Sequence, residues 1–242
     1  NLFQQFVFGK APATAVLAAV IIFAVIIAMV ILVIILNDGT RKIPVQYAKK
    51  VQGRKMVGGQ TSSIPLKVNT AGVMPVIFAS SIMQFPIIIS SFAGYSGSGV
   101  WSEILNTLNG SNWCKPSSPI YSIGLLIYVL LIVFFAYFYT SITFNPLMIA
   151  DNMKKQGGFI PGIRPGKPTS DYLNKVLNYI VFIGAVGLII VSVIPYIFNG
   201  IFGASVSFGG TSLIIIVSVV LETMKQVESQ MLVRNYKGFL ND

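Results

Sequence analysis

The stretch from Val176 to Leu221 reads VLNYIVFIGAVGLIIVSVIPYIFNGIFGASVSFGGTSLIIIVSVVL, and it decides the fold. These 46 residues contain no Asp, Glu, Lys or Arg. A membrane-crossing helix needs about 20 apolar residues, so the stretch is long enough for two crossings and a tight turn. We predict the turn where proline, asparagine and glycine gather, at Pro195, Asn199, Gly200, Gly203, Gly209 and Gly210.

The composition of the whole chain indicates the same class of protein. Of the 242 residues, 54% are hydrophobic and only 10% are charged. Soluble domains carry about 25% charged residues. The apolar runs are long and continuous, which favours helices over a membrane β-barrel, whose strands alternate over about 10 residues. We therefore predict an all-α polytopic membrane protein.

Uncharged runs predict five transmembrane helices, over residues 12–36, 70–92, 120–144, 177–198 and 210–231. The segments between them are predicted loops, at 1–11, 37–69, 93–119, 145–176, 199–209 and the tail 232–242. Positive charge is concentrated in 37–69 and 145–176 and is nearly absent from 93–119 and 199–209. Under the positive-inside rule, the first pair of loops is cytoplasmic and the second pair is external. The N-terminal end is then outside and the C-terminus is cytoplasmic.

The start of the chain suggests that it is part of a larger protein. It begins with Asn1, and nothing before that residue would carry an external end across the membrane. The first apolar run is also too long for the core of a cleavable signal, which spans about 7–15 residues. We therefore expect residues 1–11 to be an external loop.

Residues suited to catalysis or metal binding are scarce. The chain has no His, a single Cys (Cys114) and 7 Asp and Glu residues in all. This is poor material for acid–base chemistry or a metal site, and no glycine-rich segment has the spacing of a nucleotide-binding loop. We expect no enzymatic activity, no metal and no cofactor. The centres of the predicted spans also lack the charged residues that usually mark ion pathways, which argues against an ion-coupled transporter.

Two predicted cytoplasmic loops have features beyond their charge. In 37–69, the alternating stretch Val45–Val51 followed by Gly53 predicts a basic hairpin that projects from the membrane. Such a hairpin suits an acidic partner, such as ribosomal RNA or an acidic protein face. The same charge would orient the helices and attract anionic lipids, and the residues alone favour neither interpretation. In FIPGIRPGKPTSDYL, residues 159–173, the prolines stiffen the chain and put Arg164 near the tip, either solvated or presented to a partner.

Two predicted spans carry an isoleucine on a stripe of small polar residues. Ile77, Ser81, Gln84 and Ile88 share one helical face, and Thr211, Ile215, Ser218 and Glu222 share another. Helix packing through small residues is the ordinary explanation. The alternative is a wall of a water-accessible cavity, in which Ile77 and Ile215 form an apolar constriction. Pro75 and Pro86 should kink or interrupt the first of these helices.

Four runs in this order resemble the bacterial SecY family, the core subunit of the Sec protein translocation channel. They are IPVQYAKKVQGRK (43–55), GGQTSSIPLKVNTAGVMPVIFASSI (58–82), FNPLMIADNMKKQGGFIPGIRPGKPT (144–169) and FGGTSLIIIVSVVLE (208–222). The resemblance implies the C-terminal half of a ten-helix channel, with its sixth to tenth helices forming one of two inverted repeats. It also implies that the channel conducts unfolded secretory polypeptides across the plasma membrane and releases membrane helices laterally.

The resemblance further implies roles for individual residues. Ile77 and Ile215 correspond to the hydrophobic pore ring. The lateral gate, through which signal sequences reach lipid, would include Asn69, Thr70, Ser81, Gln84 and Phe85. The residues for docking SecA or the ribosome would be Arg41, Lys42, Lys49, Lys50, Arg54, Lys55 and Arg164.

The implied partners are the small subunits SecE and SecG, the SecA motor ATPase, the ribosome through its rRNA, the translocating polypeptide with its signal sequence, and the N-terminal half of the same protein; anionic lipids are the partner that the basic loops suggest. The implied location is the bacterial cell membrane. Two other hypotheses stay open, namely half of a secondary transporter and a membrane insertase or scaffold without an aqueous pore.

Overall fold

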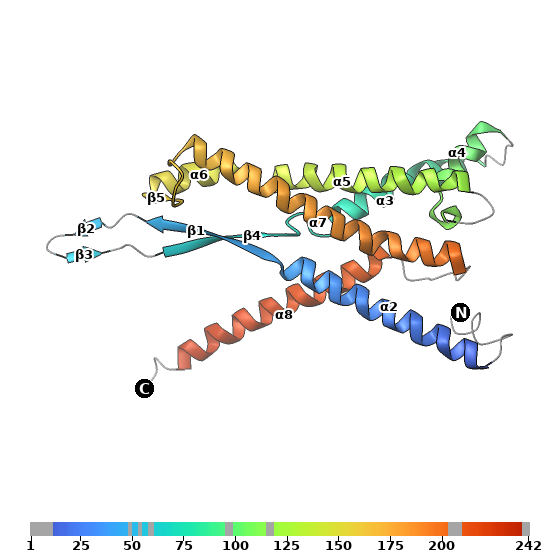
Figure 1. Ribbon diagram of the computed structural model, residues 1–242, viewed down its shortest axis with the longest axis horizontal. Coiled ribbons are helices and arrows are strands. Elements are labelled where there is room, and N and C mark those ends of the chain that lie inside the picture. The colour runs from blue at the N-terminus through green and yellow to red at the C-terminus, as the bar shows by residue number, and fades with distance from the viewer. Residues whose placement is uncertain are drawn as a thin grey trace.

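A computed structural model (Figure 1) describes residues 12–47, 50–52, 55–57, 61–94, 99–114, 119–202 and 210–238 of the chain. The helices are α2 (Pro12–Asp38), α3 (Met74–Phe92), α4 (Val100–Leu108), α5 (Ile123–Thr143), α6 (Pro146–Lys155), α7 (Lys167–Phe202) and α8 (Gly210–Gly238). The strands are β1 (Thr40–Tyr47), β2 (Lys50–Gln52), β3 (Lys55–Val57), β4 (Thr61–Lys67) and β5 (Gly158–Phe159). Two short 3₁₀ helices, Gly110–Asn112 and Pro119–Ser122, lie in the connections.

The long helices pack side by side around one apolar core. Helix α3 packs on α5, α5 packs on α7, and α2 contacts both α7 and α8. Their buried faces meet in a cluster that draws on all five helices and on Trp113. It comprises Val33, Val76, Ala79, Met83, Trp113, Tyr128, Ile132, Leu188, Val191 and Ile214.

Three helical stretches in the described part of the chain are long and apolar enough to cross a membrane. They are Met74–Phe92, Pro119–Lys155 and Lys167–Ile197. A fourth, shorter apolar stretch covers Phe23–Asp38. Large side chains on α2 remain exposed at four-residue spacing, at Phe23, Ile27, Ile31 and Ile35. An exposed apolar stripe of this kind suits contact with lipid or with another membrane helix.

The expectation of an all-α fold needs a correction, because the described residues between 40 and 67, within the basic segment 37–69, form a β-hairpin. Strand β1 pairs with β4 in antiparallel register from Thr40↔Lys67 to Gln46↔Thr61, and β2 pairs with β3. The predicted hairpin is thus confirmed in the described residues, and its first strand begins earlier than the alternating pattern indicated. Residues 48–49 and 53–54 lie outside the described part. The hairpin and α6 lie at one end of the bundle and α4 lies at the other (Figure 1).

Helix α7 is longer than the predicted span 177–198 at both ends. It begins at Lys167, inside the segment predicted as a loop, because proline is accepted in a first helical turn and Leu173 is fully buried against the hairpin. It also runs through Pro195 to Phe202, so the turn predicted at Pro195, Asn199 and Gly200 is wrong. Proline is tolerated inside membrane helices where neighbouring groups satisfy the freed carbonyl.

Four other segments differ from the sequence-based expectation. The predicted loop 93–119 contains α4, and the predicted loop 145–176 contains α6 and β5. Helix α8 continues to Gly238, beyond the expected end at 231. Pro75 lies in the first turn of α3, so residues 70–73 precede the helix and only Pro86 lies within it. Of the remaining predicted turn residues, Gly210 begins α8, and Gly203 and Gly209 lie outside the described residues.

Candidate functional site

The candidate site is an open cavity of about 450 Å³ where the end of α2, the start of α3 and the middle of α8 meet. Ile77 and Ile215, which the sequence singled out on two different helices, both line it. The other lining residues are Asn37, Lys67, Asn69, Thr70, Ala71, Gly72, Val73, Met74, Ser218, Val219, Leu221, Glu222 and Lys225. The cavity thus has apolar walls around the two isoleucines and charged groups at Lys67, Glu222 and Lys225.

Helix α3 divides its residues between the core and this cavity. Val76, Ala79 and Met83 are buried at i, i+3 and i+7, whereas the neighbouring Ile77 is half-buried and lines the cavity. The hydroxyls of Ser80 and Ser81 both donate to the carbonyl of Ile77, at 2.9 and 2.8 Å. Because these hydroxyls are satisfied within the helix, the face needs no polar partner from another helix.

Helix α8 is arranged in the same way. Ile214 is buried in the core, whereas the next residue, Ile215, is 38% exposed and lines the cavity. Ser218 and Glu222, which helical periodicity put on the same face as Ile215, also line the cavity. The side chain of Thr211, the first residue of that predicted stripe, lies outside the described residues.

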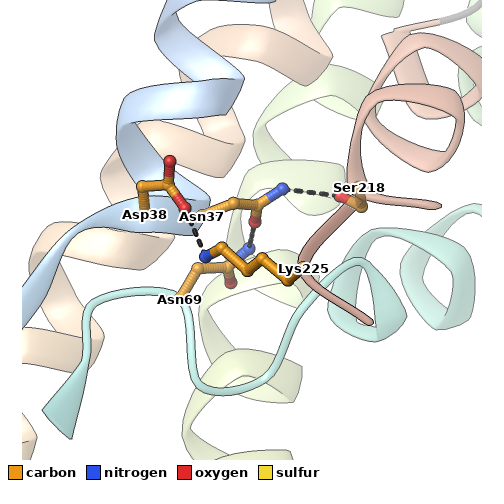
Figure 2. A network of polar contacts seen from close by, with 5 residues as sticks. All are labelled: Asn37, Asp38, Asn69, Ser218 and Lys225. Atoms are coloured by element: carbon orange, nitrogen blue, oxygen red, sulfur yellow. Dashed lines mark hydrogen bonds and ion pairs between the residues drawn. The ribbon is translucent and has the colours of Figure 1, made fainter. Parts of the chain in front are cut away.

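A polar network joins the three segments that line the cavity (Figure 2). The Nδ2 atom of Asn37 donates to the Oγ atom of Ser218 at 2.7 Å. The Oδ1 atom of Asn37 accepts from the Nδ2 atom of Asn69 at 2.9 Å. Next to this chain of hydrogen bonds, Lys225 forms an ion pair with Asp38. Asn37 and Asp38 end α2, Asn69 precedes α3, and the other two residues belong to α8.

The residues implied for a lateral gate do not gather in one place. Asn69 is buried and Thr70 donates to the carbonyl of Lys67 at 2.7 Å, and both line the cavity with Ile77. Gln84 instead lines a second cavity, of about 380 Å³, together with Ile88 and Tyr196. Phe85 is 63% exposed and Ser81 is also exposed, and neither lines the first cavity.

The two basic segments form one structural unit. Strand β5 extends the sheet beside β1 through the pair Gln46↔Phe159. Buried side chains from the sheet, α6, the Arg164 loop and α7 form one hydrophobic cluster, which comprises Ile43, Val45, Leu66, Met153, Ile160, Leu173, Val176 and Ile180. Arg41 and Lys42 are exposed on β1, and the backbones of Lys50 and Lys55 lie in β2 and β3. Lys49 and Arg54 lie outside the described residues.

Arg164 lies in a loop that is held from below. The loop turns at Gly162 and Gly166, which both have positive φ, and the side chain of Arg164 is exposed. The hydroxyl of the fully buried Thr169 donates to the carbonyl of Arg164 at 2.8 Å. The hydrogen bond fixes the backbone of Arg164 while its guanidinium stays available.

Sequence reasoning missed Asn37, Lys225 and Thr169. Asn37 is the first strongly polar residue after a long apolar run, which marked it as the start of a loop rather than as a bonded residue. The partners of Asn37 are 32 and 181 residues away and the partner of Lys225 is 187 residues away, so no local pattern connects them. Among the described residues, no three His, Cys, Asp or Glu side chains gather closely enough to hold a metal ion.

Comparison with known proteins gives consistent results. The family model described as SecY matches residues 1–224. The protein translocase subunit SecY of Streptomyces galbus is 51% identical over 209 residues, covering 86% of this chain and 46% of that protein. The subunit of Mycobacterium tuberculosis is 48% identical over 241 residues, covering 96% of this chain and 52% of that protein. The chain spans about half the length of the curated relatives it matches.

Solved structures share the fold at lower identity. One, reported under the statement that the plug domain of the SecY protein stabilises the closed state of the translocation channel, has a TM-score of 0.58 at 19% identity. It covers 85% of this chain and 48% of the solved chain. Another, described as the structure of a protein conducting channel, has a TM-score of 0.56 at 18% identity, with coverages of 95% and 57%.

Proposed function

Because this chain belongs to the SecY family, we propose that it forms the C-terminal half of a protein-conducting channel. The complete protein passes unfolded secretory polypeptides across the bacterial cell membrane and releases membrane helices sideways into lipid. This half contributes five transmembrane helices, α2, α3, α5, α7 and α8, as one inverted repeat of a ten-helix channel. The chain makes and breaks no bond in this process, so the driving energy comes from a partner.

The observation that carries the proposal is the position of the two isoleucines. Ile77 on α3 and Ile215 on α8 line the same cavity, although 138 residues separate them (215 − 77). A ring of aliphatic side chains can close to water and still deform around a passing chain. We assign both residues to such a constriction, which the N-terminal half of the protein completes. Asn69, Thr70, Ser81, Gln84 and Phe85 form this chain's part of a lateral gate.

The hairpin, β5 and the Arg164 loop form the docking platform for the partner that delivers the polypeptide, either the SecA motor or the ribosome. The platform is cytoplasmic, and α4 is external. This orientation is supported by the concentration of Lys and Arg in the segments at the platform end of the bundle. SecE, SecG and anionic lipids cover the exposed apolar faces of the helices and the basic residues near the membrane.

Two other functions fit less well. A secondary transporter usually carries charged residues within its spans, whereas residues 176–197 of α7 include no Asp, Glu, Lys or Arg. A scaffold or insertase without an aqueous path would not need a shared cavity between α3 and α8.

Photo-crosslinking in the complete protein tests the proposal. A photoreactive residue replaces Ile77 or Ile215 while a radiolabelled secretory chain is stalled midway. Ile82 and Ile216 are matched controls, because they are exposed isoleucines on the same two helices that do not line the cavity. Lys154, exposed on α6, is an off-pore control. We expect crosslinks from Ile77 and Ile215 that disappear when the signal sequence is deleted. Equal labelling from the controls, or none from the cavity positions while the chain stays bound, would refute the assignment.

A further inference from the structure

We propose that Asn37 is a positioning residue that sets the spacing between α3 and α8, and with it the resting width of the Ile77–Ile215 constriction. Its side chain is the central member of the polar network in Figure 2 and bonds to both neighbours. The inference rests on the proposed function only in treating this spacing as that of a channel. The contact itself is a property of the described residues.

Asn37 forms hydrogen bonds with both ends of its side-chain amide. The Nδ2 atom donates to Ser218 on α8, and the Oδ1 atom accepts from Asn69 at the entry to α3. Asn69 is buried, and Asn37 is partly buried. Leaving a buried amide without a partner is unfavourable. The three side chains are therefore held together, and Asn37 is the one that joins the two others.

The polar network lies close to the constriction on both sides. Ser218 lies one helical turn after Ile215, about 4.5 Å along the axis, and on the same face. On the other side, Asn69 precedes α3, and only the short turn that includes Gly72, at φ 64°, separates it from the helix that carries Ile77. A change in the distance between Ser218 and Asn69 must therefore move the two isoleucines relative to each other.

The neighbouring ion pair contributes less than Asn37 does. The side chains of Lys225 and Asp38 are 56% and 47% exposed, so water and salt screen their attraction. Lys225 lies seven residues after Ser218, on the same face of α8 and farther from Ile215. The ion pair adds a second, weaker contact, between α2 and α8. The hydrogen bonds of the Asn37 amide, in contrast, are short and partly shielded from water.

A crosslinking ratio in the complete protein measures this spacing. The Ile77→Cys and Ile215→Cys substitutions are combined in an otherwise cysteine-free protein that includes Cys114→Ser. Resting membranes are treated with a short and with a long bis-maleimide, and the ratio of the two yields is recorded. Asn37→Leu removes both hydrogen bonds at similar volume, and Ser218→Ala removes one. Ser229→Ala is the matched control, since the Ser229 hydroxyl bonds only to its own helix at Gln226.

We expect Asn37→Leu to lower the short-to-long ratio about five- to a hundredfold, the population shift that two net hydrogen bonds provide. Ser218→Ala should lower it less, and Ser218→Thr, which keeps the hydroxyl, should restore it. The Asn37→Leu, Ser218→Ala double variant should be no worse than Asn37→Leu alone, because both disrupt the same bond. Should Asn37→Leu fail to fold, Ser218→Ala and Asn69→Ala carry the test.

Two results would overturn the inference. One is a ratio in Asn37→Leu and Ser218→Ala that equals the ratio in Ser229→Ala. The other is a lowered unfolding temperature with an unchanged ratio, which would make the network an ordinary packing contact. The outcome is independent of the photo-crosslinking result. If the secretory chain crosslinks to Ile77 but the Asn37 and Ser218 variants leave the ratio unchanged, only the role of Asn37 is refuted. A changed spacing without a chain crosslink removes the channel assignment instead.

Discussion

Helix α7 offers a sharp steric test of how the site is held, through the matched pair Gly184→Ala and Gly187→Ala. A Cβ atom at Gly184 would lie 2.5 Å from the carbonyl oxygen of Val68, next to Asn69. A Cβ atom at Gly187 would lie 2.4 Å from the Cδ2 atom of Leu36. The two clashes are equally close, but one neighbour is backbone and the other is the end of a flexible side chain.

The expected magnitudes follow from what has to move. At Gly184 the segment before α3 must shift by about 1 Å to restore van der Waals contact, and overpacking of this kind costs about 1–3 kcal/mol. The shift also stretches the Asn69–Asn37 hydrogen bond, a further loss of about 1 kcal/mol. Alanine regains about 1 kcal/mol of helix propensity over glycine. The net loss of unfolding free energy at Gly184 is about 1–3 kcal/mol.

At Gly187 the side chain of Leu36 adopts another rotamer, at a cost of about 0.5–1.5 kcal/mol. The gain in helix propensity offsets most of this cost, so we expect a change near zero. Thermal unfolding of the complete protein in detergent, followed by the fraction that stays monodisperse, compares the two variants. Gly184→Ala should unfold a few degrees below the parent protein and below Gly187→Ala. Equal shifts, or a larger loss at Gly187, would refute the claim that α7 sets the position of the segment before α3.

Two further predictions concern the platform and the ion pair. Thr169→Val should weaken, several-fold, the co-sedimentation of ribosomes with vesicles that contain the complete protein, because the carbonyl of Arg164 loses its hydrogen-bond partner. Thr169→Ser, which keeps the hydroxyl, should not weaken it. Equal binding by both variants would contradict the proposed support of this loop. Asp38→Asn should lower the unfolding free energy by less than about 1 kcal/mol, since the ion pair is exposed, and the difference should vanish at high salt. A larger loss that persists in high salt would show that the ion pair contributes more than its exposure indicates.

The sequence predicted most reliably what depends on long apolar runs and on alternation. The uncharged stretch Val176–Leu221 indicated long helices, and the structure has α7 and α8 there. The alternating stretch Val45–Val51 followed by Gly53 indicated a hairpin, and the structure has β2 paired with β3 across that point and β1 alternating between buried and exposed residues. These signals are local, so tertiary contacts were not needed to read them.

The errors arose where tertiary contacts decide the outcome. Pro195 looked like a turn residue, yet it is buried within α7, where packing keeps the helix continuous. Lys167–Lys175 looked like part of a loop because of its charge, but Leu173 anchors this segment against the hairpin. In the site, helical periodicity put Ile77 and Ile215 on stripes with small polar residues, and the structure has both isoleucines lining one cavity. It gave no information about Asn37, whose partners come from other parts of the chain.

The residues between the hairpin and the cavity lie at the ends of the predicted spans. Dividing the chain into spans and loops therefore separated residues that are hydrogen-bonded to one another. Hydropathy put boundaries at 36/37 and 69/70, directly beside Asn37 and Asn69. In the structure, the amide of Val68 donates to the carbonyl of Gly39 at 2.8 Å, which closes the base of the hairpin. A Cβ atom on Gly39 would lie 3.0 Å from the carbonyl of Ile35 and 3.1 Å from Val68, so the closure is tight.

The same few residues therefore end α2, close the hairpin and begin the segment that leads into α3. Strand β4 ends at Lys67, two residues before Asn69, and β1 starts two residues after Asp38. The Asn37–Asn69 hydrogen bond lies three residues before β1 and two residues after β4, so a displacement of the hairpin acts on it directly. Polar residues at the edges of apolar runs, which hydropathy treats as the places where structure ends, are here the residues that connect the hairpin to the cavity.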